Sequence, residues 1–147
     1  MKKVSREERR TNYHYFLTIP TRWQDVDMYS HVNNIIFYAF FDTVIGDYLV
    51  RAGGLDYANG DFAGFAVETH CHFLKPVRFP DVLDVGLRAG KLGNTSCRYE
   101  LGVFRQPDEE PCAVGYFVHV YVDRVTTRPI PIAGKLREAL EKLVVLQ

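Results

Sequence analysis

The sequence has no excess of charge of either sign. Its 147 residues carry 18 lysines and arginines against 18 aspartates and glutamates, so the formal net charge is +0. Without a net charge, the chain has no long-range attraction to nucleic acid or to an anionic membrane surface. The balance therefore argues against nucleic acid as a partner, while a local basic pocket for a phosphorylated ligand is still allowed.

Long apolar runs and cysteines are also scarce. No stretch approaches the roughly 20 apolar residues of a transmembrane helix, and no apolar segment follows the basic residues 1–10 as it would in a secretory signal. Cys71, Cys97 and Cys112 lack CxxC spacing, and their odd number prevents complete pairing within one chain. We therefore expect reduced thiols, a cytoplasmic protein without membrane insertion, and a mobile N-terminal segment over residues 1–12.

Signatures of several common enzyme classes are missing. There is no Gly-x-Ser-x-Gly elbow, P-loop or dinucleotide-binding fingerprint, so the serine-hydrolase, nucleotidase and hydride-transfer classes are disfavoured. His70, Cys71 and His72 include zinc-ligand types, but in a strand Cys71 would point away from both histidines. Because the spacing also matches no zinc pattern, we predict no metal site.

What the sequence does contain is the pattern of one domain, over residues 13–147. Apolar and polar residues alternate over residues 13–23, which predicts a strand, and Pro20 favours an edge position or a bend in the strand. Short connections between the later strands favour an antiparallel meander. The four further strands are expected over residues 62–74, 82–91, 96–104 and 113–122.

Residues 34–52 have the spacing of a long helix that is apolar nearly all round, and such a helix is expected to be buried. Gly53 and Gly54 mark its end, and a second helix is expected over residues 134–147. Covering the central helix requires a strongly curved sheet. The sequence therefore predicts an α+β fold with a curved five-stranded antiparallel sheet around a long helix, and apolar surface left for a second subunit.

The densest polar cluster lies directly before this helix. Two aspartates, a histidine and two asparagines form the pattern D-x-D-x-x-x-H-V-N-N over residues 25–34. The pattern resembles the signature of hotdog-fold acyl-CoA thioesterases, the 4-hydroxybenzoyl-CoA thioesterase-like family. The resemblance extends over nearly the whole chain after residue 12, through Leu74-Lys75-Pro76-Val77 with Asp81, Gly93-Asn94-Thr95-Ser96, and Val122-Asp123 with Thr126-Thr127-Arg128-Pro129.

The resemblance implies a hotdog fold and hydrolysis of an acyl-CoA thioester, with coenzyme A as part of the substrate and no separate cofactor. It also implies a homodimer with sites at the subunit interface, or a tetramer made of two dimers. The matching catalytic carboxylate is Asp27, as base or nucleophile, and the matching oxyanion donor is the backbone N–H of Asn34. Asp25, His31 and Asn33 are expected to shape the loop.

Alternatives remain open at this point. A D-x-D before a helix is commonly just a turn and an N-cap, and Ser30, where many relatives carry glycine, could cap the helix instead. The fold would also suit a noncatalytic protein that binds acyl-CoA or an acyl carrier protein, or a hydratase or dehydratase. Phe37, Phe40, Phe62 and Phe65 are compatible with an acyl pocket, and candidates for binding the coenzyme A phosphates are Lys75, Arg78, Arg124 and Arg128.

Overall fold

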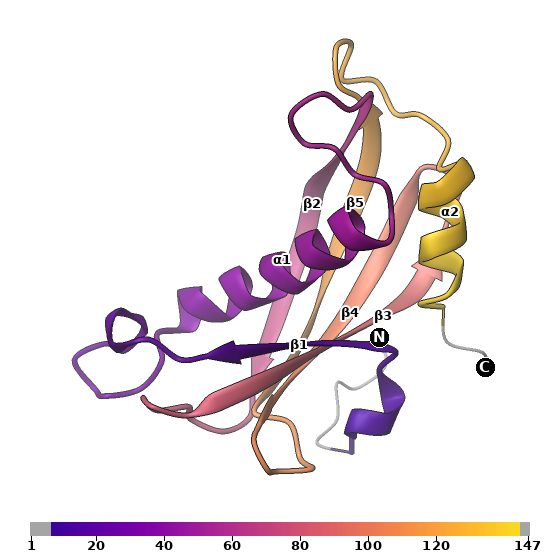
Figure 1. The fold of residues 1–147 in the computed structure, drawn as a ribbon. Coiled ribbons are helices and arrows are strands. Elements are labelled where there is room, and N and C mark those ends of the chain that lie inside the picture. The colour runs from indigo at the N-terminus through magenta and orange to yellow at the C-terminus, as the bar shows by residue number, and fades with distance from the viewer. Residues whose placement is uncertain (1–6, 145–147) are drawn as a thin grey trace.

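A computed structural model describes residues 7–144 (Figure 1). Short 3-10 turns are η1 (Arg10–Asn12) and η2 (Trp23–Asp25). The longer elements follow the predicted order and confirm the α+β architecture. They are β1 (Tyr15–Pro20), α1 (Asn34–Arg51), β2 (Phe62–Phe73), β3 (Val82–Leu92), β4 (Ser96–Arg105), β5 (Ala113–Asp123) and α2 (Gly134–Glu141). No helix within residues 7–144 is long and apolar enough to cross a membrane.

The five strands form one antiparallel sheet in the order β1-β3-β4-β5-β2. The predicted edge position of the strand containing Pro20 is confirmed, and β3, β4 and β5 form a meander. The meander prediction is wrong for β2, which pairs with β5 at the other edge. Residues 74–81 can reach about 26 Å when extended, whereas β2 and β3 lie three strand spacings apart, about 14 Å. The connection is therefore long enough to cross the sheet.

Helix α1 lies across one face of the sheet (Figure 1). Its buried side consists of Phe37, Phe40, Phe41, Val44, Ile45, Tyr48 and Leu49. The prediction that the helix is buried nearly all round is wrong for the single chain, because Ile35 is 65% and Val50 47% exposed. One sheet covers only one side of a helix, so the opposite side keeps an exposed apolar surface.

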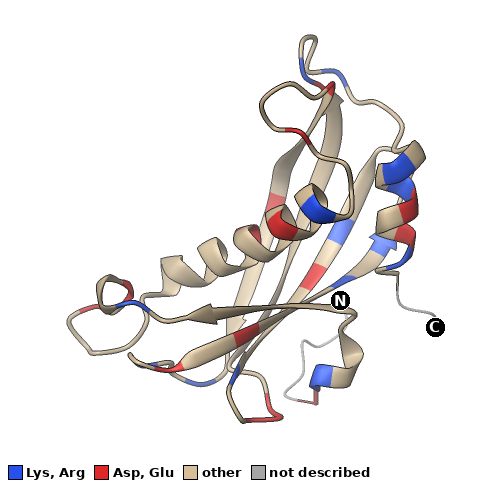
Figure 2. Ribbon diagram, viewed as in Figure 1, with Lys and Arg blue, Asp and Glu red and all other residues tan. Residues whose placement is uncertain are grey.

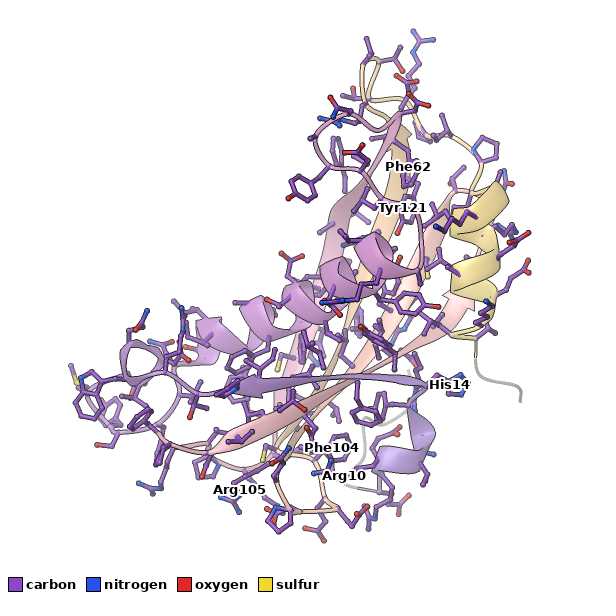
Figure 3. The ribbon with its side chains drawn as sticks, viewed as in Figure 1. Arg10, His14, Phe62, Phe104, Arg105 and Tyr121 are labelled. Carbon is purple, nitrogen blue, oxygen red and sulfur yellow. The ribbon has the colours of Figure 1, made fainter. Side chains whose placement is uncertain are left out.

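The N-terminal segment was predicted to be mobile over residues 1–12, of which residues 1–6 lie outside the described part. Arg10 forms an ion pair with Asp84 of β3 at 2.7 Å. Its guanidinium also lies 5.2 Å from the ring centroid of Phe104 on β4 (Figure 3). Glu8 pairs with Arg88 at 2.9 Å. These contacts attach residues 8–10 to the sheet. The mobility of residues 1–12 in solution stays a prediction.

Close packing of α1 on the sheet depends on Gly115 in β5. A Cβ atom at this position would overlap the His70 carbonyl oxygen and would lie 2.7 Å from Cε2 of Phe41. Phe41 is fully buried on α1. The missing side chain therefore lets Phe41 of α1 pack directly against β5.

We predict that Gly115→Ala lowers the free energy of unfolding by about 1–3 kcal/mol, because the added methyl overpacks the contact between β5 and Phe41. Urea denaturation would measure the change. The control is Gly46→Ala in α1, where a Cβ meets nothing within 4 Å. Helix propensity should make this control more stable by about 1 kcal/mol. A Gly115→Ala protein as stable as wild type would contradict the packing argument.

Candidate active site

The loop before α1 is a tight hairpin. Val26 and Val32 form an isolated antiparallel bridge, and between them the Asp27 N–H donates to the His31 carbonyl at 2.9 Å while the Ser30 N–H donates to the Asp27 carbonyl at 3.0 Å. Ser30 has φ 62°, the left-handed conformation that glycine adopts without strain. Serine thus takes a backbone conformation that favours glycine.

Asp25 is the buried anchor at the base of this loop. It is 1% exposed, and its carboxylate accepts hydrogen bonds from the Arg22 backbone N–H at 2.8 Å and from the Arg22 guanidinium at 2.8 and 3.0 Å. Its carbonyl accepts from the Asn33 N–H at 2.9 Å. Because a buried carboxylate needs such partners, Asp25 ties both ends of the loop together.

Asn33 caps α1. Its backbone is extended, with φ −61° and ψ 140°, and its side-chain oxygen accepts from the Ile35 N–H at 3.2 Å. The idea that Ser30 caps the helix is therefore wrong. Asn34 is the first residue of α1, and no acceptor within residues 7–144 takes its N–H. This free donor lies at the positive end of the helix dipole.

A cavity of about 270 Å³ opens at this helix terminus. The Val32 N–H donates to the Val77 carbonyl at 2.7 Å, which joins the loop to the connection between β2 and β3. The rings of Phe37 and Phe73 pack edge to face at 5.3 Å. The cavity therefore combines an apolar wall with polar groups, and it is lined by His31, Val32, Asn34, Phe37, Phe73, Leu74, Lys75, Pro76 and Val77.

The electrostatics of the cavity favour an anion or a polarised carbonyl at its helix end. The first turn of α1 has no acidic residue, and no charged residue precedes Asp42 in the helix (Figure 2). The positive end of the dipole is therefore not neutralised by its own helix. A carbonyl oxygen placed at the Asn34 N–H would find an uncompensated donor.

Asp27 is not among the residues that line this cavity. Its Oδ1 accepts from the Tyr29 N–H at 2.9 Å, and no donor within residues 7–144 bonds its second carboxylate oxygen. Of the residues predicted from the motif, the structure thus places His31 and Asn34 together at the cavity, Asp27 beside it in the hairpin, and Asp25 and Asn33 beneath it.

The aromatic residues considered for an acyl pocket separate in the structure. Phe37 lines the cavity, whereas Phe40 is buried in the core. Phe62 packs against Tyr121 at 6.1 Å, at the opposite end of β2 and β5 (Figure 3). Phe65 is exposed on β2. Phe73 was missed, although it shares its strand parity with Cys71, the residue of that strand that faces the core.

The group around Cys71 divides between two faces, as strand alternation predicts. Cys71 is buried in the core, and His70 stacks on Tyr116 at 5.5 Å. His72 is exposed. Within residues 7–144, no set of three histidine, cysteine, aspartate or glutamate side chains is arranged to hold a metal ion.

The antiparallel sheet, the long helix across its face and the cavity at the helix N-terminus define the hotdog class of α+β protein. Residues 21–140 match the family model of the Thioesterase-like superfamily, and the chain belongs to that superfamily. The resemblance read from the D-x-D-x-x-x-H-V-N-N motif is thereby confirmed.

Known relatives agree with this assignment. The chain is 24% identical over 127 residues to the long-chain acyl-CoA thioesterase FadM of Escherichia coli, covering 86% of this chain and 96% of FadM. The crystal structure of the PA5185 protein from Pseudomonas aeruginosa superposes with a TM-score of 0.91 at 46% identity, covering 92% and 95% of the two chains. The 1,4-dihydroxy-2-naphthoyl-CoA thioesterase Slr0204 of Synechocystis, 18% identical with a TM-score of 0.79 over 88% and 96%, shares the fold.

We predict that Asn33→Ala lowers the free energy of unfolding by about 1 kcal/mol, because the cap on the Ile35 N–H is lost. Thermal unfolding would measure the change. Asn33→Asp is the matched control, since aspartate caps about as well as asparagine, and it should keep wild-type stability. Equal destabilisation by both substitutions would show that the cap is not the stabilising contact.

Proposed function

We propose that this protein is an acyl-CoA thioesterase that hydrolyses the thioester to a free acid and coenzyme A. The observation that carries the proposal is the Asn34 N–H, which has no partner within residues 7–144 and lies at a cavity with an apolar wall. A thioester carbonyl bound there would receive a hydrogen bond that strengthens as its oxygen becomes an oxyanion. Losing one such donor costs about 3 kcal/mol in other hydrolases, so the arrangement is large enough to matter.

Asp27 is the proposed chemical group. Its free carboxylate oxygen either attacks the carbonyl carbon, so that the C–S bond breaks, the coenzyme A thiolate leaves and water hydrolyses the resulting anhydride, or takes a proton from an attacking water. The hydrogen bonds of Tyr29 N–H to Oδ1 and of Asp27 N–H to His31 hold the carboxylate in one orientation. Asp25, His31 and Asn33 are proposed to act indirectly, by holding the loop.

The proposal includes a homodimer, because the site of a single chain is open and its apolar surroundings are incomplete. β2 is an edge strand of 12 residues, and an unprotected edge presents unpaired N–H and C=O groups to another chain. Val67 on β2 is 60% exposed and Ile35 on α1 is 65% exposed. Pairing of two β2 edges would cover both and would put the two sites near the interface.

The proposed location is the cytoplasm. All three cysteines, Cys71, Cys97 and Cys112, are unpaired and buried. Burial raises the pKa of the Cys71 and Cys97 thiols to about 12, so both stay protonated at neutral pH. Such thiols are inert rather than catalytic, and free cysteines are usual in a reducing compartment.

We predict that Val67→Lys shifts the protein from dimer to monomer, because a buried lysine at the paired edge would be desolvated without a partner. Light scattering coupled to gel filtration would measure the mass. Val125→Lys is the control, since Val125 is also apolar and 92% exposed but lies in the loop after β5. A dimer that tolerates the Val67→Lys change would place the interface elsewhere.

We predict that Asp27→Asn lowers kcat by about 10²–10⁴, because the amide can neither attack nor accept the proton effectively. The measurement is thiol release across a panel of acyl-CoA chain lengths. Asp56→Asn is the control, because Asp56 also accepts backbone N–H groups, from Ala58 at 3.1 Å and Asn59 at 3.0 Å, in a turn outside the cavity.

The same panel separates the alternatives. A folded Asp27→Asn protein with unchanged turnover on a good substrate would overturn the role of Asp27. Tight acyl-CoA binding without thiol release by wild type would indicate a noncatalytic binding protein. A change in conjugated enoyl absorbance without thiol release would indicate a hydratase or dehydratase.

A further inference from the structure

Lys75 lies between two cavities. It lines the cavity of about 270 Å³ that contains the Asn34 N–H. It also lines a second cavity of about 160 Å³, together with Leu74, Glu110 and Pro111. Because Leu74 and Lys75 belong to both linings, the two cavities adjoin each other at these residues. The Lys75 ammonium forms an ion pair of 2.8 Å with Glu110.

The backbone of Lys75 is held in place by the connection that carries Glu110. The N–H groups of Leu74 and Lys75 both donate to the Cys112 carbonyl, at 2.8 and 3.0 Å. Pro76 follows immediately and restricts the backbone of Lys75 to extended conformations. The backbone of the lysine is thus fixed, and its side chain lies where the two cavities adjoin.

The ion pair with Glu110 is one that a ligand could replace. The side chains of Lys75 and Glu110 are 35% and 59% exposed, and ion pairs between such exposed side chains are weak because water screens them. The hydrogen bond from Lys75 lowers the pKa of Glu110. The Glu110 carboxylate is therefore charged at neutral pH and holds the Lys75 ammonium in the ion pair. A phosphate offers acceptor oxygens on several sides, so it can take over the hydrogen bonds of the ammonium from this carboxylate.

The other basic residues considered for phosphate binding lie elsewhere. Arg124 donates to the carbonyls of Asp56 and Gly60 at 3.4 and 3.3 Å. It follows β5, whose last residue pairs with Phe62, at the opposite end of β2 from Phe73. Arg128 lies beyond it in the same loop. Arg78 shares the connection between β2 and β3 with Lys75, but it lines neither cavity.

We infer that the Lys75 ammonium is the binding subsite for the phosphate of a 4′-phosphopantetheine thioester, and that Glu110 holds the ammonium until this phosphate displaces it. The inference rests on the proposed thioesterase function. It names the phosphate as the group of the substrate that binds at Lys75. Coenzyme A and acyl carrier proteins share this phosphate, so either could be the carrier. A hydrated phosphate fits the half-exposed position of Lys75 better than a group that must be buried.

The test compares two thioesters of one acyl group, an acyl-4′-phosphopantetheine and the acyl-pantetheine without phosphate. Lys75→Met should raise KM for the phosphorylated thioester about tenfold, the loss of one charge-assisted contact. It should leave KM for acyl-pantetheine, and kcat for both, close to wild type. Glu110→Gln should lower KM for the phosphorylated thioester, because the competing carboxylate is removed.

Arg78→Met is the matched control and should change neither KM. Repeating the comparison with acyl-CoA and an acyl carrier protein identifies the carrier as the one with the higher kcat/KM for wild type, and its KM should rise in Lys75→Met. Equal KM increases for both pantetheine thioesters would overturn the phosphate assignment in favour of a structural role. A KM increase confined to thioesters with a carboxylate on the acyl chain would overturn it in favour of an acyl-group subsite.

Failure of the proposed function would be recognised separately, as absence of thiol release from every thioester by the wild-type protein. In that case calorimetry with coenzyme A and with pantetheine tests the subsite directly. Lys75→Met should then weaken binding of coenzyme A about tenfold and leave pantetheine unchanged. Unchanged affinity for coenzyme A would overturn the subsite.

Discussion

The hydrogen bond from the Asn33 N–H to the Asp25 carbonyl, at 2.9 Å, is the constraint on which the site depends. It joins the end of the loop to its beginning, and the buried Asp25 carboxylate in turn fixes Arg22. The bridge between Val26 and Val32 then closes the hairpin between these two ends. The Asn33 side chain can then cap the Ile35 N–H and leave the Asn34 N–H free for a ligand.

A second constraint acts at the level of packing. α1 is too apolar to be covered by one sheet, and the sheet can approach it only where Gly115 leaves room for Phe41. The helix therefore buries one side and exposes Ile35 and Val50. Among residues 7–144, no strand pairs with the outer side of the edge strand β2. In the proposed homodimer, a second copy of the chain covers both the exposed side of α1 and the unpaired edge of β2.

Local features were predicted well because their causes lie within a few residues. The helix predicted over residues 34–52 is Asn34–Arg51, and the strands agree with the alternating patterns to within a few residues. Of the edge position and the strand bend that Pro20 favoured, the edge position is correct, because proline has no N–H to donate to a neighbouring strand. The helix predicted over residues 134–147 ends at Glu141, and residues 145–147 lie outside the described part.

Long-range features had no such local signal. The sequence by itself determined the element order, the edge strand and the motif that identifies the superfamily, because helix periodicity, strand alternation and the contacts of residues 25–35 all act over short separations. Only the tertiary structure decided that β2 pairs with β5, that α1 leaves one side exposed, and that Phe73 and Lys75 join Asn34 at one cavity. These outcomes depend on which distant surfaces pack together, and a connection that can reach either edge of the sheet does not fix that choice.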